Sequence, residues 1–205
     1  MIAVIDYGAG NLRSVSNALV RLGYQPRVTR EPEDVLNARA VIFPGVGAAA
    51  DAMQSLRESG MDEAIQEVIR QGQPLFAICV GMQVMLSSTE EGGWNECLGV
   101  IPGTVKRLPL GLKVPHIGWN QVKQADRHPL FEGIPDESNF YFVHSYYPEP
   151  EDATVVAGTS EYGINFCSVL IKDNLVATQF HPEKSGELGL RIYANFLLRM
   201  AGIKE

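Results

Sequence analysis

Short apolar runs alternate with longer amphipathic segments along the first half of the chain. Three runs predict buried strands, at Ile2–Asp6, Val41–Phe43 and Leu75–Ile78. Four segments with apolar residues at helical spacing predict helices, at Asn11–Leu22, 48–58, 62–71 and Val80–Ser88. Gly23, Gly60 and Gly72, at or just beyond the ends of the first three segments, are typical of helix ends. Strands that alternate with helices in this way predict a parallel sheet covered on both faces.

The second half, from about residue 100 to 180, is rich in Val, Ile, Phe and Tyr, and Gly, Pro and Asp interrupt it. Four further strands are predicted, at Phe140–His144, Val155–Gly158, Phe166–Ile171 and Leu175–Phe180. The last two are joined by a turn too short to hold a helix, so they should pair antiparallel. A final helix follows over 186–200. The predicted fold class is α/β. We expect a single domain, 1–205, with a mixed, mostly parallel sheet between helices and an antiparallel region in its second half.

Composition and charge narrow the class of protein. The 205 residues are 45% hydrophobic and 20% charged, as in a soluble globular protein. The net charge of -7 and the lack of Lys or Arg clusters disfavour nucleic-acid binding. No apolar run approaches the roughly 20 residues that span a bilayer. The first residues also lack a basic region followed by a long apolar stretch. We therefore expect a cytoplasmic protein that binds neither nucleic acid nor membrane.

The cysteines predict one reactive thiol rather than a disulfide or zinc framework. Cys79, Cys97 and Cys167 are odd in number and have no Cys-x-x-Cys spacing. His116 and His128 have no partners at metal-ligand spacing, so no metal site is predicted.

Cys79 carries the strongest local signal. The stretch Ala77–Gly81 (Ala-Ile-Cys-Val-Gly) lies between a predicted strand and a predicted helix. A nucleophile on such a turn projects from the sheet, and small residues two positions to either side avoid collisions. The N-terminus of the following helix would favour thiolate over thiol. The alternative is a cysteine that packs at a strand end as a small apolar side chain.

His181 and Glu183 follow another apolar strand in the stretch Phe-His-Pro-Glu. Reactive groups gather at the carboxyl ends of parallel strands, so His181 could meet Cys79. A catalytic cysteine needs a base, and the base needs a third group that orients it, here Glu183. The alternative is a His-Pro turn with a solvent-exposed glutamate.

Pro44–Gly47 (Pro-Gly-Val-Gly) also comes directly after a strand. Its glycines let the backbone approach a ligand and present N–H groups to an oxyanion, with the Val80 N–H as a second donor. The alternative is an ordinary strand-to-helix turn.

Gly8-Ala9-Gly10 resembles the start of a dinucleotide fingerprint, but Arg13 stands where its third glycine belongs. Trp119 lies in a polar stretch and fits either a partner surface or the core.

Taken together, these residues resemble the class I (triad) glutamine amidotransferases, which have a flavodoxin-like α/β fold. The resemblance rests on Cys79–Gln83 (Cys-Val-Gly-Met-Gln) and 181–185 (His-Pro-Glu-Lys-Ser). Three further motifs narrow the resemblance to one group of the family: 5–12 (Ile-Asp-Tyr-Gly-Ala-Gly-Asn-Leu), 44–47 (Pro-Gly-Val-Gly) and 115–120 (Pro-His-Ile-Gly-Trp-Asn). Within the family the chain is most similar to the glutaminase subunits of imidazole glycerol phosphate synthases, along nearly its whole length. Ala77 departs from the glycine common at that position of the family.

The resemblance implies Cys79 as nucleophile, His181 as base and acid, and Glu183 as the residue that orients His181. Oxyanion donors would come from Val46, Gly47 and Val80. The residues that this resemblance implies for glutamine binding are Gly45, Gln83, Glu91, His144, Ser145 and Tyr146. Those near a partner interface are Asn11, Trp119, Asn120, Tyr141 and Lys184. Glu90 lies beside Glu91, so these two could exchange roles.

The resemblance further implies that ammonia from glutamine passes to a (β/α)₈-barrel cyclase subunit in a heterodimer. That subunit would form imidazole glycerol phosphate and an aminoimidazole carboxamide ribonucleotide, in histidine biosynthesis. No cofactor is expected. We also expect the isolated chain to be nearly inactive, because a free glutaminase would waste glutamine and release ammonia where no acceptor waits. The expected switch is the Pro44–Gly47 loop, in which the Val46 N–H can point either away from the oxyanion position or toward it.

Two other functions remain open from the residues. The chain could serve another class I amidotransferase, such as one that feeds anthranilate or pyridoxal phosphate synthesis. It could also be a non-catalytic regulatory subunit on the same fold.

Overall fold

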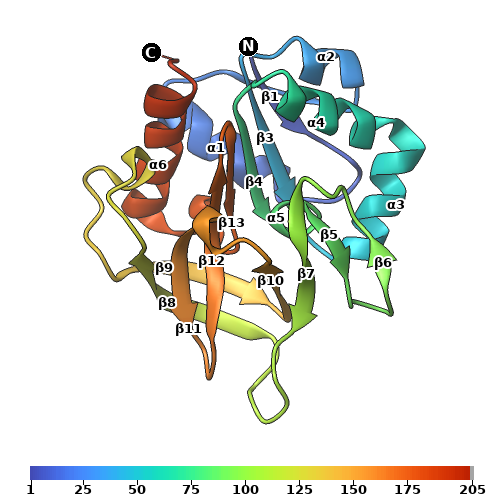
Figure 1. Cartoon of the computed structure of the whole chain (residues 1–205). Helices are drawn as coiled ribbons and strands as arrows, with labels where there is room; N and C mark the ends of the chain where they lie inside the picture. The colour runs from blue at the N-terminus through green and yellow to red at the C-terminus, as the bar shows by residue number, and fades with distance from the viewer. Residues whose placement is uncertain (204–205) are drawn as a thin grey trace.

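A computed structural model describes residues 1–203, and it is an α/β structure with two sheets (Figure 1). The first half alternates strands with helices. Its strands are β1 (Ile2–Ile5), β2 (Pro26–Thr29), β3 (Ala40–Gly45), β4 (Leu75–Cys79), β5 (Leu86–Thr89) and β6 (Asn95–Glu96). Its helices are α1 (Leu12–Arg21), α2 (Pro32–Leu36), α3 (Ala49–Ser59), α4 (Met61–Arg70) and α5 (Val80–Gln83).

The second half is mostly strands. They are β7 (Ile101–Arg107), β8 (His116–Gln124), β9 (Ser138–His144), β10 (Tyr146–Pro150), β11 (Val156–Glu161), β12 (Asn165–Lys172) and β13 (Leu175–Thr178). Short 3-10 turns are η1 (Pro129–Phe131), η2 (Ala153–Val155) and η3 (Pro182–Lys184). The described part of the chain ends with helix α6 (Gly186–Asn195) and the π-helical segment η4 (Phe196–Met200).

The large sheet has nine strands in the order β2-β1-β3-β4-β13-β12-β11-β8-β9. Neighbours from β2 to β13 pair in parallel, and those from β13 to β9 pair antiparallel. Strand β13 therefore joins the two parts, since it lies parallel to β4 and antiparallel to β12. This arrangement brings the C-terminal third of the chain against the first strands.

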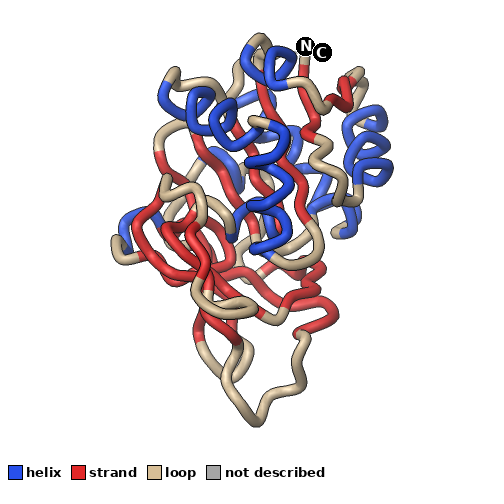
Figure 2. The backbone as a smooth tube through the Cα atoms, turned by 90° about the vertical axis from the view of Figure 1, so that its right-hand side faces the viewer, coloured by secondary structure: helices blue, strands red, loops and turns tan. Residues whose placement is uncertain are grey.

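Helices cover both faces of the parallel part (Figure 2). Helix α1 packs against α6, and α4 packs against both α2 and α3. Strands β1, β3, β4 and β13 are buried at every position, as expected for strands covered on both sides. No helix within residues 1–203 has the length and apolarity needed to cross a membrane.

The predicted fold class is confirmed, and most predicted elements are present with ends that differ by a few residues. The antiparallel pairing of β12 with β13 across Lys172–Asn174 is also confirmed. Strand β3 is longer than predicted and includes Pro44 and Gly45, so only the end of the predicted Pro44–Gly47 loop is a loop. The predicted domain end at 205 lies outside the described residues.

The helix predicted over Val80–Ser88 is wrong beyond its first turn. Helix α5 ends at Gln83, and the chain continues into strand β5. The apolar run Val84–Leu86 fits a short strand as well as a helix, which makes such runs ambiguous in sequence. Ser and Thr at 87–89 are poor helix formers. Pairing with β7 therefore stabilises this segment as a strand and not as a helix.

A second sheet, ordered β10-β7-β5-β6, was not predicted. Its strands come from distant parts of the chain, and β7 pairs in parallel with β5 but antiparallel with β10. Strand β2 and helix α2 were also missed. Strand β2 lies at the edge of the large sheet and is partly exposed, so it lacks the apolar run that marks the inner strands.

Candidate active site

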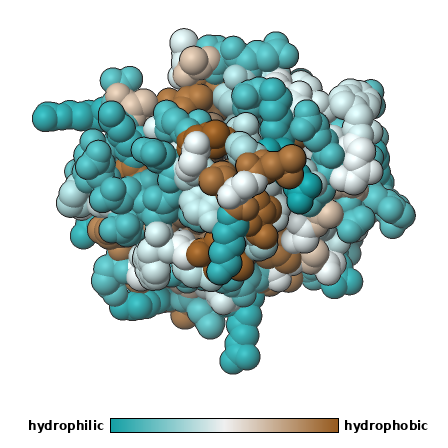
Figure 3. All heavy atoms as spheres, turned by 90° about the horizontal axis from the view of Figure 1, so that it is seen from below, coloured by the Kyte–Doolittle hydropathy of each residue, from teal (hydrophilic) through white to brown (hydrophobic). Residues whose placement is uncertain are grey.

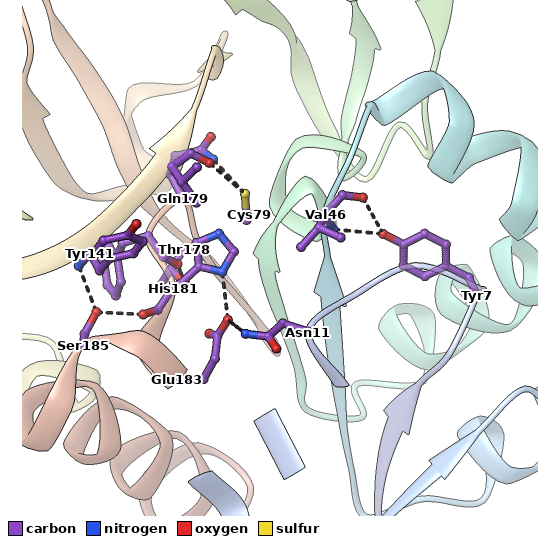
Figure 4. Close-up of polar contacts among 12 residues, drawn as sticks. Tyr7, Asn11, Val46, Cys79, Tyr141, Thr178, Gln179, His181, Glu183 and Ser185 are labelled. Atoms are coloured by element: carbon purple, nitrogen blue, oxygen red, sulfur yellow. Dashed lines mark hydrogen bonds and ion pairs between the residues drawn. The ribbon is translucent and has the colours of Figure 1, made fainter. Parts of the chain in front are cut away.

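Three adjacent parallel strands bring the candidate catalytic segments together at their carboxyl ends. Strand β4 pairs with β3 on one side and with β13 on the other. Cys79 is the last residue of β4, and His181 comes shortly after β13. Figure 4 shows the His181 imidazole between Cys79 and Glu183, with Val46 on the opposite side of Cys79. Residues that are more than 100 positions apart in sequence therefore meet because their strands are neighbours.

Cys79 has the backbone conformation of a nucleophile on a sharp turn. Its φ of 55° and ψ of -108° are unusual for a residue with a Cβ. A Cβ added at Gly81 would collide with the Phe43 carbonyl oxygen, and one at Gly45 would collide with the Gly81 nitrogen. Small residues are thus required where the turn packs against β3. Ala77 is fully buried on β4, between β3 and β13.

His181 and Glu183 form a buried pair. The His181 Nδ1 donates to Glu183 Oε1 at 2.8 Å, and both side chains are almost fully buried. This bond places the second nitrogen, Nε2, on the side of Cys79, where it makes no hydrogen bond within the described residues. Burial lowers the pKa of His181, but the Cys79 thiolate and the Glu183 carboxylate outweigh it and raise that pKa to about 10. The arrangement therefore favours the imidazolium form of His181 beside Cys79.

A cavity of about 380 Å³ opens directly over Cys79 and His181. Its volume is within the range of small-molecule sites, about 300–1,000 Å³. It is lined by Val46, Gly47, Cys79, Val80, Gln83, Glu91, Pro115, Val143, His144, Ser145, Tyr146, His181 and Lys184. A larger hollow of about 750 Å³ lies on the surface around Arg127 and Glu132, far from these groups in the fold. The smaller cavity is the candidate site because it contains the reactive side chains.

The predicted oxyanion donors are only partly arranged for that role. The Val80 N–H belongs to the first residue of α5, where N–H groups have no partner within the helix. The Val46 N–H instead donates to the Tyr7 hydroxyl at 3.2 Å, on the side away from Cys79 (Figure 4). Gly47 lines the cavity with a φ of 89°. The structure thus has the Val46 N–H in the first of the two expected orientations, pointing away.

The residues predicted to bind glutamine lie at the cavity, except that Gly45 packs behind it in β3. Gln83 Nε2 donates both to the Tyr146 carbonyl, at 3.0 Å, and to Gln179 Oε1, at 3.1 Å. Its two N–H groups are therefore used, and only Oε1 is left for a ligand.

Glu91 lines the cavity, whereas its neighbour Glu90 is exposed. Glu91 Oε2 accepts the Ala49 N–H at 2.7 Å, at the start of α3. Burial raises the pKa of Glu91, and the Ala49 N–H partly opposes this. A half-buried carboxylate at the cavity wall can pair with a ligand ammonium group.

Three of the five predicted interface residues form one cluster. Lys184 Nζ lies 5.6 Å from the centre of the Tyr141 ring. The Tyr141 ring meets Trp119 edge-on, with centroids 6.1 Å apart. Trp119 is 58% exposed, and Lys184 also lines the cavity. The cluster therefore connects the cavity to the outer surface.

The other two predicted interface residues bond to other parts of the chain. Asn120 projects from β8 toward β11 and donates to the Glu161 carbonyl at 2.8 Å. Asn11 Nδ2 donates to Glu183 Oε1 at 3.5 Å, so Asn11 supports the carboxylate that orients His181. Neither shares the exposed cluster of Trp119.

Comparison with known protein families gives a match over almost the whole chain. The family described as "Glutamine amidotransferase class-I" matches residues 3–200. The chain belongs to this family.

Similar proteins support the assignment. The "Imidazole glycerol phosphate synthase subunit HisH" of Dehalococcoides mccartyi (strain CBDB1) is 57% identical over 205 residues, which is 100% of both chains. The protein of that name from Moorella thermoacetica is 53% identical over 203 residues, 98% of this chain and 97% of its own. Like other class I glutamine amidotransferases, the chain is a cysteine-dependent, glutamine-hydrolysing enzyme.

Solved structures share the fold of this class I amidotransferase. One, titled "Crystal structure of glutamine amidotransferase", has a TM-score of 0.74 at 22% identity and covers 99% of this chain and 100% of its own. The "Structure of PurLQS from Thermotoga maritima" has a TM-score of 0.77 at 17% identity, with 96% of both chains covered.

Two residues at the amidotransferase site were missed in the sequence. Gln179 Nε2 lies 3.6 Å from Cys79 Sγ, and Tyr7 holds Val46. Gln179 had a signal, because it is a polar residue two positions before His181 on an apolar strand, and alternate strand residues share a face. Tyr7 belongs to the motif at 5–12, but nothing in the sequence indicated its contact, which is with a residue 39 positions away.

Proposed function

We propose that this chain is the glutaminase subunit of an imidazole glycerol phosphate synthase. The observation that carries the proposal is the 57% identity, over the whole of both chains, to a protein named as subunit HisH of that synthase. The chain would hydrolyse glutamine at Cys79 and pass ammonia to a (β/α)₈-barrel cyclase subunit, with no cofactor of its own. Its place in the cell would be the cytoplasm.

In the first half of the reaction, the Cys79 thiolate attacks the side-chain amide carbon of glutamine. The carbonyl electron pair moves to oxygen, and backbone N–H groups of the oxyanion site stabilise the resulting charge. The oxyanion intermediate then collapses, His181 Nε2–H protonates the leaving nitrogen, and the carbon–nitrogen bond breaks. The products are ammonia and a γ-glutamyl thioester on Cys79.

In the second half, neutral His181 takes a proton from water, which attacks the thioester carbon. The carbon–sulfur bond breaks, so glutamate leaves and the thiolate and imidazolium are restored. Glu183 keeps Nδ1 protonated and Nε2 free for both steps. At the other end of the substrate, the Glu91 carboxylate would pair with the α-ammonium group.

The face that carries Trp119 is proposed to bind the cyclase subunit. Figure 3, the view from below, shows apolar side chains gathered at the centre of this end of the molecule. Large apolar residues exposed on β8 and on the loop before it are Ile117, at 60%, and Leu110, at 92%. Apolar area of this kind, next to the active-site cavity, suits a partner that receives a small product.

The test is to mix the chain with a cyclase subunit of such a synthase, isolate the complex and measure glutamate and imidazole glycerol phosphate formed from glutamine. Stable association with an anthranilate or pyridoxal phosphate synthase subunit instead would favour another class I amidotransferase. Failure of a glutamine-like thiol reagent to label Cys79 in the complex would favour a non-catalytic subunit.

Replacing Glu183 by glutamine should reduce glutamine hydrolysis less than His181→Ala does. The glutamine variant keeps the shape of the pair but loses its charge, and we expect it to retain about 10- to 100-fold more activity than His181→Ala. Single-turnover rates of glutamate formation test this ranking. A Glu183→Gln protein as fast as the parent would remove Glu183 from the triad.

The same variant should alter the pH profile. The Glu183 charge helps to raise the pKa of His181, so its removal lowers that pKa. Because the imidazolium is the proton donor, the alkaline limb of activity should then move to lower pH. An unchanged limb would contradict the coupling.

Tyr7→Phe should raise glutamine hydrolysis by the isolated chain by up to about 10-fold. Burial raises the pKa of Tyr7 to about 12, so the hydroxyl keeps its proton and can bond both the N–H and the carbonyl of Val46. Loss of the hydroxyl destabilises the peptide orientation in which the Val46 N–H points away from the cavity. The ring contact with Phe43 is retained in phenylalanine.

Tyr162→Phe is the matched control, because the Tyr162 hydroxyl bonds the Lys113 carbonyl and no residue of the cavity. It should leave the basal rate unchanged. A Tyr7→Phe rate equal to that of this control would show that Tyr7 does not hold the loop.

A further inference from the structure

A hydrogen-bonded chain of side chains ends on the sulfur of Cys79. It starts at the Tyr146 carbonyl oxygen, which accepts from Gln83 Nε2 at 3.0 Å. Gln83 Nε2 also donates to Gln179 Oε1 at 3.1 Å, and Gln179 Nε2 lies 3.6 Å from Cys79 Sγ. Gln83 is nearly and Gln179 completely buried, so these bonds are shielded from water.

The polarity of this chain fixes which end of each amide faces the sulfur. A carbonyl oxygen can only accept, so the amide nitrogen of Gln83 must face Tyr146. The second N–H on that nitrogen then meets Gln179, which must turn its oxygen toward Gln83. The Gln179 nitrogen is left to face Cys79, and Figure 4 shows it directed at the sulfur.

His144 donates a second hydrogen bond to the Tyr146 carbonyl oxygen, at which the hydrogen-bonded chain starts. Burial lowers the pKa of His144 to about 3, so the ring is neutral. Its Nδ1 lies 2.9 Å from the Tyr146 carbonyl oxygen and must therefore carry the hydrogen. The Tyr146 oxygen thus accepts two hydrogen bonds and holds its position.

The sulfur has opposing contacts. The Val143 carbonyl oxygen lies 3.9 Å away and can only accept, so it favours the protonated thiol. The Gln179 N–H donates, so it favours the thiolate. Helix α5 has a single turn, which makes its dipole a weaker source of stabilisation than a full helix.

We propose that Gln179 is the side-chain donor that stabilises the Cys79 thiolate and fixes the direction of its sulfur, with Gln83 as the positioning residue that orients Gln179. This proposal rests on the proposed role of Cys79 as the nucleophile. Gln83 then acts on the thiolate through Gln179 in addition to any contact of its oxygen with glutamine.

Other titratable groups around the sulfur also influence the pH dependence of Cys79. They are His181 with Glu183 behind it, Tyr7 beyond Val46, and the cavity residues His144, Glu91 and Lys184. None of them is altered by a substitution at Gln179.

The experiment measures the rate of Cys79 alkylation by iodoacetamide as a function of pH, in the full chain with Cys97 and Cys167 replaced by alanine. Gln179→Met keeps the length of the side chain and removes the donor. We expect its alkylation rate at neutral pH to fall about 10-fold, and the acid midpoint of the profile to rise by about one pH unit. A steric or purely structural role would leave that midpoint in place.

Thr178→Val is the matched control. Thr178 is a fully buried neighbour on β13, and its hydroxyl bonds the Phe180 carbonyl instead of the sulfur. Its profile should match that of the parent. Gln83→Met leaves Gln179 in place but removes the residue that orients it. It should raise the midpoint as Gln179→Met does, but by a smaller amount. This variant serves as the test if Gln179→Met does not fold.

The proposal is overturned if folded Gln179→Met has the same acid midpoint of alkylation as the parent. Alkylation does not require glutamine, so this result differs from failure of the proposed function, in which the parent complex itself does not hydrolyse glutamine. In the complex, Gln179→Met should lower kcat by about the same factor of 10 and leave KM for glutamine nearly unchanged.

Discussion

Replacing Cys79 by alanine is expected to reduce glutamine hydrolysis by about 10⁵-fold or more, while the fold is retained. The triad residues act as a unit, so removal of the nucleophile leaves only what binding and the oxyanion site supply. The sulfur lies at a turn beside His181, and a methyl group fits the same space. Glutamate release and thermal unfolding of the variant are the measurements. In the complex with a cyclase subunit, synthesis from added ammonium salt should survive, because that route bypasses the thiol.

The other two cysteines are the controls. Burial raises the pKa of Cys97 to about 11 and raises that of Cys167 as well, so neither thiol ionises near neutral pH. Cys97→Ala and Cys167→Ala should change activity little. Hydrolysis by Cys79→Ala at the parent's rate, or its loss in a folded variant of either control, would mean that the nucleophile is another residue.

Binding of the cyclase subunit is expected to raise glutamine hydrolysis about 10²- to 10³-fold over the isolated chain. This is the usual effect of one oxyanion donor, and the Val46 N–H is directed at Tyr7 in the present structure. A partner that favours the other orientation can shift the population only by its difference in affinity for the two states. Glutamate formation is measured for the chain alone, with the cyclase subunit, and with its nucleotide ligand added.

Lys184→Ala should weaken this activation, since Lys184 lies between the Tyr141–Trp119 cluster and the cavity. The intrinsic reactivity of the Cys79 thiol should be that of the parent. An isolated chain that is already as fast as the liganded complex would exclude gating at Val46, and it would leave the triad unaffected.

The sequence predicted an element correctly where a single local pattern, such as an apolar run or a short turn, fits only one structure. The buried strands β1, β4 and β13 are continuous apolar runs, and the turn Lys172–Asn174 is too short for anything but an antiparallel return. The turn at Cys79 needs a glycine at position 81 because a Cβ there would collide with the Phe43 carbonyl oxygen of β3. These requirements act over a few residues, so the sequence displays them directly.

The sequence by itself determined the α/β class, the strand-end positions of Cys79 and His181, and the pairing of His181 with Glu183, two residues apart. Only the tertiary structure decided that Val84–Leu86 leads into a strand of a second sheet, that Asn120 bonds the Glu161 carbonyl, and that Tyr7 holds Val46. It also decided that the Gln179 amide nitrogen faces the sulfur, since that depends on the Tyr146 carbonyl and on Gln83. The physical reason is that hydrogen bonds and strand pairs between distant residues are chosen by the neighbours that folding supplies, whereas apolar periodicity and turn geometry act within a single segment.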